Sequence, residues 1–195
     1  EQVEGVLRAE LREAALESVF REVEMPLVAV LAQMEDTGIT VDVAKLEALG
    51  KQLSASLADI AKRVYELAGQ EFNLDSPKQI GEVLFGVLKL PKGKKTKTGW
   101  STSAEVLDEL AAEHEIAAKI LEHRELAKLR STYVEALLRE ADPETHRIHT
   151  TLEQTVAATG RLSSRNPNLQ NIPVRTALGR EIRSCFIAGP GMALV

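Results

Sequence analysis

Two long amphipathic stripes constrain this chain more strongly than any other feature. Within each stripe, apolar side chains recur at steps of three and four residues, the spacing of one helix face. The first stripe contains Leu46, Leu49, Leu53, Leu57, Ile60, Val64 and Leu67, and the second, within 113–140, contains Ile116, Ile120, Leu126 or Ala127, Tyr133 or Val134, and Leu137. An apolar helix face must be buried against a partner, so the pattern predicts two long helices packed antiparallel.

The segment between the stripes, 72–110, predicts short helices joined by a basic loop. Ser76-Pro77-Lys78-Gln79 and Thr102-Ser103-Ala104-Glu105 both have the pattern of a capping box at a helix start. The loop between them contains Lys92, Lys94, Lys95 and Lys97. Helix starts and lysines together favour phosphate binding. An ordinary solvated loop has the same composition, so the residues alone leave both interpretations open.

The first 36 residues predict more helix. Their apolar positions also recur at steps of three and four and include Leu16, Val19, Phe20, Val23, Leu27, Val30, Leu31 and Met34. Pro26 should break or kink this helix, most simply by starting a second one. Thr37-Gly38 should end it, before a short extended segment at 39–41 and Asp42 as a candidate N-cap.

The segment 154–175 is rich in hydrogen-bond donors. It contains Arg161, Arg165, Arg175, Asn166, Asn168, Gln170 and Asn171. Such side chains can read correct base pairing in a minor groove, because its acceptors are shared by A·T and G·C pairs. Amides that bond their own backbone in turns would give the same composition, so both interpretations stay open. From Ile148 onward a period of two predicts strands near 148–158, 182–188 and 192–195.

Charge and composition narrow the class of protein. The formal net charge is −5, yet from Gln154 onward five arginines (161, 165, 175, 180 and 183) stand against the single acid Glu181. This local imbalance favours an anionic partner at the C-terminal part of the chain. No signal peptide or membrane span is predicted. The single Cys185 excludes an internal disulfide and fits a reducing cytoplasm.

Several motifs together resemble a known family. T-G-R-L-S-S, P-N-L-Q-N-I-P-V-R and I-R-S-C-F-I-A follow one another after residue 158, and F-N-x-x-S-P-x-Q and K-T-K-T-G-x-S-T-S precede them. They resemble the family A DNA polymerases, the bacterial DNA polymerase I family. The resemblance implies a mainly α fold: a thumb made of a long antiparallel helix pair with a helical tip, then an incomplete α/β palm segment of two to three strands. The implied domains are a tail of a preceding exonuclease-type domain or linker at 1–21, a thumb at 22–141, and the first part of the palm at 142–195.

The resemblance also implies two sets of DNA-binding residues. Those implied at the minor groove near the primer end are Arg161, Asn168, Gln170, Asn171 and Arg175. Those implied at the phosphate backbone are Asp75, Ser76, Lys97, Ser101, Thr102, Ser103, Arg124, Lys128 and Tyr133. The chain departs from the family pattern at Ala157, where threonine is frequent, and at Arg165-Asn166, where a small residue and an acid are usual.

Catalysis is expected to need residues outside this chain. By resemblance, the parent enzyme is a bacterial, nucleoid-associated polymerase that uses Mg²⁺, dNTPs and primer–template DNA. Two-metal nucleotidyl transfer needs at least two carboxylates, and after Gln154 only Glu181 is available. In the family, the strand that begins near Met192 leads to the first metal-binding aspartate. We therefore expect the ligands to come from the rest of the palm and the fingers, in cis or as a second chain, and the chain alone to be inactive.

Three alternatives remain from the sequence: a non-catalytic duplex-binding module, one half of a split polymerase, and a helical scaffold that binds no DNA. The histidines do not form a metal-binding pattern and are expected to be structural or to face solvent; they are His114, His123, His146 and His149. Neither a metal site nor a catalytic residue is predicted within these 195 residues.

Overall fold

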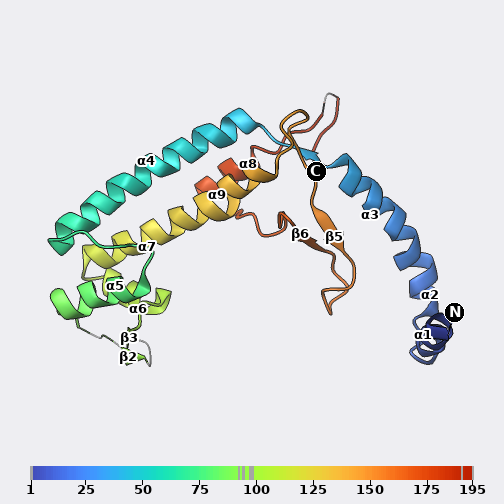
Figure 1. Cartoon of the computed structure of the whole chain (residues 1–195), viewed down its shortest axis with the longest axis horizontal. Helices are drawn as coiled ribbons and strands as arrows, with labels where there is room; N and C mark the ends of the chain where they lie inside the picture. Colours follow the sequence, from blue (N-terminus) through green and yellow to red (C-terminus); the bar gives the residue numbers. More distant parts are fainter. Residues whose placement is uncertain (1, 92, 94, 97–98, 190, 195) are drawn as a thin grey trace. The chain divides into compact units, whose positions relative to one another are not determined.

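The computed structural model describes residues 2–91, 93, 95–96, 99–189 and 191–194. These form two compact units (Figure 1). One unit is the continuous segment 44–138, and the other combines 1–43 with 139–195. No helix in the described part of the chain is long and apolar enough to cross a membrane.

The predicted helix pair forms the body of the unit 44–138. Its first arm is α4 (Val43–Ala68), and its second arm is the continuous helical run of α7 (Glu115–Lys128), η3 (Leu129–Glu135) and α8 (Ala136–Glu140). Figure 1 shows the two arms side by side and antiparallel. The first stripe is buried as predicted, except that Ala68 rather than Leu67 completes it. A Cβ added at Gly50 on α4 would lie only 3.3 Å from Val134 on η3, so the two arms approach closely there.

A π-helical turn changes the burial pattern of the second arm. The η3 segment has more residues per turn than an α-helix. The buried positions therefore no longer follow the steps of three and four that the stripe predicted. As a result Leu129, Tyr133 and Val134 are all buried. The sequence predicted that either Tyr133 or Val134 would be buried, and it did not predict burial of Leu129. Leu126 is only partly buried.

The far end of the pair is the predicted helical tip. It consists of α5 (Pro77–Gly81), η2 (Glu82–Val87), the hairpin strands β2 (Lys95–Thr96) and β3 (Gly99–Trp100), and α6 (Ala104–Ala111). Apolar side chains of the tip and of both arms share one core. Trp100 packs on Phe85 with ring centroids 5.1 Å apart, and the Nζ atom of Lys95 lies 4.9 Å from the centroid of its ring. The indole is therefore a packed support under the hairpin.

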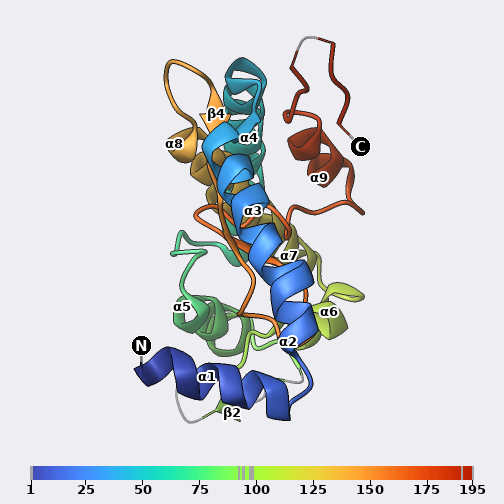
Figure 2. The same cartoon turned by 90° about the vertical axis from the view of Figure 1, so that its right-hand side faces the viewer.

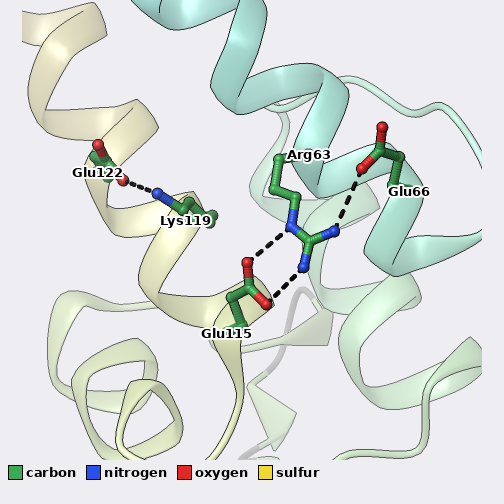
Figure 3. A network of polar contacts seen from close by, with 5 residues as sticks. All are labelled: Arg63, Glu66, Glu115, Lys119 and Glu122. Carbon is green, nitrogen blue, oxygen red and sulfur yellow. Dashed lines mark hydrogen bonds and ion pairs between the residues drawn. The ribbon is translucent and has the colours of Figure 1, made fainter.

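Charged side chains join the two arms beside the core (Figure 3). Arg63 on α4 donates to both carboxylate oxygens of Glu115 on α7, at 2.8 Å each, and to Glu66 at 3.3 Å. Arg63 lowers the pKa of the Glu115 carboxyl, chiefly through these hydrogen bonds. One turn further on α7, Lys119 pairs with Glu122 at 2.7 Å. The bidentate geometry fixes how the end of α4 faces the start of α7.

Only one of the two predicted capping boxes is even partly formed. The Ser76 hydroxyl accepts from the Gln79 N–H at 3.4 Å, but the Gln79 side chain accepts from the N–H of Asn73 rather than of Ser76. The box predicted at 102–105 is wrong: α6 is preceded by Ser103 as N-cap, without a side-chain capping bond. Thr102 lies one residue before the N-cap, and its hydroxyl accepts from Arg124 instead.

The N-terminal part of the other unit is helical, but its interruption is not at Pro26. The elements are α1 (Gln2–Glu13), α2 (Glu17–Val19), η1 (Phe20–Glu24) and α3 (Met25–Thr37). The chain turns sharply after α1, where Ala15 has a φ of 55°, and Figure 2 shows α1 running across the direction of α3. Pro26 lies in the first turn of α3, which begins at Met25, and the chain stays helical from η1 into α3, so the predicted break is not formed there. The π-helical η1 lies directly before α3, and the Met25 N–H donates to the Phe20 carbonyl five residues back.

The C-terminal part forms short antiparallel strand pairs, one of them with an N-terminal strand, and in its described residues it also contains a helix. The strands are β1 (Ile39–Thr40), β4 (Arg147–Ile148), β5 (Thr151–Glu153) and β6 (Ser163–Arg165); β1 pairs with β4, and β5 with β6. The predicted strand beginning at 182 is wrong, since α9 (Ala177–Arg183) occupies this region and buries Ile182. Residues 154–158 and 192–194 are not strands either. In these segments the Ala157 carbonyl accepts from the Gly160 N–H at 3.1 Å, and the Met192 N–H donates to the Gly189 carbonyl at 3.0 Å, as in turns. Phe186 forms an isolated bridge with Val41.

Two glycines of the tip provide a matched test of this packing. A Cβ at Gly81 on α5 would lie 2.8 Å from the Trp100 Cβ, whereas a Cβ at Gly86 on η2 would meet nothing within 4 Å. Gly81→Ala should therefore destabilise the unit by roughly 1–3 kcal/mol through overpacking. Gly86→Ala should be neutral or slightly stabilising, because alanine favours helix. Urea unfolding followed by circular dichroism checks this, and equal midpoints for the two variants would contradict it.

Candidate nucleic-acid interface

The first candidate surface is the segment 161–175, called here the amide segment. It contains β6, and the part that follows this strand is anchored by side chains of Thr150 and Ser164. The buried Ser164 accepts from the Leu169 N–H at 3.1 Å, and the Thr150 hydroxyl contacts the carbonyls of Arg165 at 3.0 Å and Pro167 at 2.8 Å. The backbone of the segment is thus held in place while its polar side chains face outward.

The three amides predicted at the minor groove have two roles in this geometry. Asn168 Oδ1 accepts from the N–H groups of Gln170 at 3.0 Å and Asn171 at 3.3 Å, and Gln170 Nε2 donates to the Leu162 carbonyl at 2.8 Å. These bonds are the ones expected if the amides serve to stabilise turns of their own backbone. All three amide residues are nevertheless exposed, and the NH₂ group of Asn168 takes no part in the two bonds to its oxygen. The turn therefore presents donors to solvent.

The arginines of the amide segment differ in their partners. Arg161 and Arg175 are exposed, and the carbonyl of Arg175 accepts from Arg180 Nη1 at 2.8 Å. Arg165 forms an ion pair with Glu153 across the hairpin, with Nη2 3.0 Å from Oε1. Within the described part of the chain, no ion pair involves Arg161 or Arg175. The predicted minor-groove set, Arg161, Asn168, Gln170, Asn171 and Arg175, thus lies exposed along one anchored segment.

The second candidate surface is a hollow of about 500 Å³ at the tip. It brings together residues from the start of α5, the segment before α6, and α7. Its lining, called here the tip hollow, consists of Leu74, Asp75, Pro77, Trp100, Ser101, Thr102, Ser103, Arg124 and Ala127. Asp75, Ser101, Thr102, Ser103 and Arg124 were all predicted at the phosphate backbone. Tertiary structure therefore gathers residues that are nearly 50 positions apart in sequence.

The remaining predicted backbone residues lie in different settings. Ser76 adjoins the hollow as the N-cap of α5. Lys128 is exposed on α7, whereas Tyr133 is buried on η3. Lys97 lies outside the described residues, as do Lys92 and Lys94. The tip hollow thus contains only part of the predicted set.

Arg124 has a structural partner that sequence reasoning missed. Its guanidinium donates to the Thr102 carbonyl at 2.5 Å and to the Thr102 hydroxyl at 3.0 Å. Arg124 is half-buried, and this burial lowers the pKa of its guanidinium, which nevertheless stays charged at neutral pH. The pair spans 22 positions, so no local pattern could have indicated it. Arg124 holds the 101–103 segment against α7.

The described histidines do not build a metal site. Burial lowers the pKa of His123, and the charge of Asp75 opposes this shift only partly. The His123 Nδ1 and His114 Nε2 atoms are buried without a hydrogen-bond partner among the described residues. The described part of the chain also has no group of three His, Cys, Asp or Glu residues able to hold a metal ion.

Comparison with known proteins gives a consistent result. The sequence model of DNA polymerase family A matches residues 43–195. DNA polymerase I of Geobacillus stearothermophilus is 52% identical over 185 residues, which are 95% of this chain and 21% of that protein. The thermostable DNA polymerase I of Thermus thermophilus is 53% identical over 179 residues, 91% of this chain and 22% of that protein. The chain thus spans about a fifth of the length of these relatives.

A solved structure agrees with the sequence comparison. It is the POL domain of Pol1 from M. smegmatis in complex with DNA primer-template and dNTP. Its TM-score is 0.86 at 44% sequence identity, and the match covers 96% of this chain and 33% of that one. The predicted fold class, a mainly α helix pair with a helical tip followed by a partial palm, is confirmed.

Arg124 and Lys128, one helical turn apart, allow the structural role of Arg124 to be measured. Arg124→Ala should destabilise the unit 44–138 by roughly 1–3 kcal/mol, because the buried Thr102 loses both donors. Lys128→Ala, at an exposed position, should change stability by less than about 0.5 kcal/mol. Chemical unfolding monitored by Trp100, the single tryptophan of the chain, tests both. A stability loss of the same size in both variants would contradict the assigned role.

Proposed function

The chain belongs to DNA polymerase family A, and on that premise we propose that it is the duplex-holding part of a DNA polymerase I. In this proposal the amide segment follows the minor groove near the primer end, and the tip hollow follows the phosphate backbone. The observation that carries the proposal is the anchored, exposed array of arginine and amide donors at 161–175. The similar M. smegmatis polymerase domain, solved in complex with DNA primer-template and dNTP, supports it.

The chemistry of the amide segment suits a template-copying enzyme. The purine N3 and pyrimidine O2 acceptors in the minor groove are present for every correct base pair. Donors fixed at this groove therefore favour correct pairing without selecting a sequence. Arg161 supplies a cation, and Asn168 and Gln170 supply neutral donors, on a backbone that Thr150 and Ser164 hold in place. A rigid backbone lowers the entropic cost of binding.

The tip hollow suits contacts that do not depend on sequence. Ser101 and Ser103 supply hydroxyls, and Ser103 precedes the first turn of α6, whose N–H groups are available to an anion. Asp75, also in the hollow, is an acid and would repel a phosphate, so the bound backbone must pass on the side of the serines. Lys128 would add a cation on the same helix as Arg124. Such contacts position a duplex and give affinity that falls with salt.

The domain bounds form part of the proposal. Residues 22–141 would be the thumb, 142–195 the first part of the palm, and 1–21 a tail of a preceding exonuclease-type domain or a linker. The whole enzyme would carry out DNA-templated DNA synthesis from dNTPs in replication and repair, in the bacterial cytoplasm. The rest of the palm and the fingers would be supplied in cis or by a second chain.

Family A DNA polymerases generally use divalent metal ions, but the described residues do not fit such a site. Two-metal chemistry requires converging carboxylates. Glu181 is the single acid after Gln154 in the sequence, and the described part of the chain contains no metal-binding group of three. We assign no step of the reaction to a metal within these residues. The Mg²⁺ ligands of the proposed enzyme would be contributed from outside this chain.

Salt dependence of binding tests the proposed function. The 195-residue chain should bind a labelled primer–template with an affinity that falls steeply as salt rises. Arg161→Ala should weaken binding and make log K fall less steeply with log[salt], because the segment loses a cation close to the DNA phosphates. Arg8→Ala, which removes an exposed arginine of α1 paired with Glu4, is the matched control and should change neither. Fluorescence anisotropy measures both quantities. Absence of binding would instead support a helical scaffold, and salt-dependent binding that Arg161→Ala leaves unchanged would contradict the role proposed for the amide segment.

Primer extension tests the catalytic part of the proposal. The purified chain should bind primer–template but incorporate no nucleotide from dNTPs and Mg²⁺, because one carboxylate after Gln154 cannot hold two metal ions. A complete DNA polymerase I assayed in parallel provides the positive control. Extension that appears only after a second polypeptide is added would favour one half of a split polymerase. Extension by the pure chain would overturn the prediction.

A further inference from the structure

Arg165 is set apart from the other arginines of the C-terminal part of the chain. Among the described residues after 154, it is the arginine that forms an ion pair, with Nη2 3.0 Å from Glu153 Oε1. The strand register explains the pair. Thr151 lies opposite Arg165 and Glu153 opposite Ser163, so Arg165 and Glu153 are diagonal neighbours on one face of the hairpin. Leu152 and the buried Ser164 point to the other face.

The two residues of the ion pair, Glu153 and Arg165, differ in their surroundings and in their exposure. The residues on either side of Glu153 are tied to α3 and the turn before it: the Leu152 N–H donates to Glu35 at 2.6 Å, and Gln154 Nε2 donates to Glu24 Oε2 at 2.6 Å. The Glu153 side chain is 27% exposed, whereas that of Arg165 is 60% exposed. The chain on both sides of the acid is therefore held, and the more exposed guanidinium is the partner that an arriving anion can reach.

We propose that Arg165 is an additional phosphate ligand that Glu153 holds in a masked state. This proposal rests on the proposed function of the amide segment and adds a residue that regulates its affinity. The backbone of Arg165 is fixed by the ladder and by Thr150, so its side chain starts from the same anchored segment as Arg161 and Asn168. Its guanidinium has five N–H donors and binds carboxylate and phosphate in the same way.

The physical properties of the pair permit the exchange. An ion pair this exposed contributes little to stability, because water screens it and long side chains lose entropy in forming it. A DNA phosphate arriving at the segment can therefore compete with the carboxylate. The ion pair with Glu153 also affects DNA affinity, because the carboxylate cancels the positive charge that Arg165 adds to the segment. The chain therefore binds the duplex less tightly than it would if Arg165 were unpaired. Glu153 thus acts as an autoinhibitory contact on DNA affinity.

Neutralising Glu153 tests the proposal on the 195-residue chain. Glu153→Gln should bind a labelled primer–template about three- to tenfold more tightly, with a slope of log K against log[salt] steeper by about 0.9, one additional phosphate contact. Glu181→Gln is the matched control: it removes the same charge from an exposed residue of the C-terminal part without releasing Arg165, and should leave the slope unchanged. The double variant Glu153→Gln/Arg165→Gln should return to the slope of the unsubstituted chain.

The outcomes separate the inference from the function on which it rests. If the unsubstituted chain binds DNA and Arg161→Ala reduces its salt slope, but Glu153→Gln behaves like Glu181→Gln, masking by Glu153 is overturned and the proposed function stands. If the double variant keeps the full gain, Arg165 is not the phosphate ligand and the inference is again overturned. If the unsubstituted chain shows no salt-dependent binding, both fail. Thermal unfolding of each variant provides a readout of folding, and equal midpoints ensure that changes in slope report binding.

Discussion

Burial of the two apolar stripes against each other is the interaction on which the unit 44–138 depends. Most helical stability in proteins comes from packing of an amphipathic face, and each buried Leu or Ile side chain adds roughly 1.5–3 kcal/mol of hydrophobic stabilisation. Gly50 allows α4 to approach Val134 on η3, and Arg63 fixes the opposite end through Glu115. The tip core, which includes Ile120 on α7, continues the same contact surface.

This packing determines where the polar groups of the tip lie. Arg124 is on α7, one turn beyond the buried Ile120, so the arms place its guanidinium at the segment before α6. There it donates to the Thr102 carbonyl and hydroxyl, and the N-cap position of α6 is Ser103, which makes no side-chain capping bond. A residue expected at the duplex backbone thus first acts within the protein. Any contact it makes with a phosphate must use the donors that Thr102 leaves available.

The amide segment shows how a turn can also be a binding surface. Asn168 and Gln170 bond to backbone groups of their own segment, as ordinary turn amides do. Both are still exposed, and the same bonds hold their remaining donors in fixed directions. The two interpretations that the sequence left open are therefore compatible. Internal hydrogen bonding prearranges the segment, and exposure makes it available to a ligand.

The sequence by itself determined the helix pair, the tip and the donor-rich segment, because these follow from periodicity and composition, which are local properties. It did not determine the π-helical turn that buries both Tyr133 and Val134, the chain reversal at Ala15, or the helix in place of a strand at Ile182. Nor did it reveal the Arg124–Thr102 and Arg165–Glu153 pairs. Those depend on which distant groups meet once the arms pack and the hairpin takes its register, and only the tertiary structure decides that.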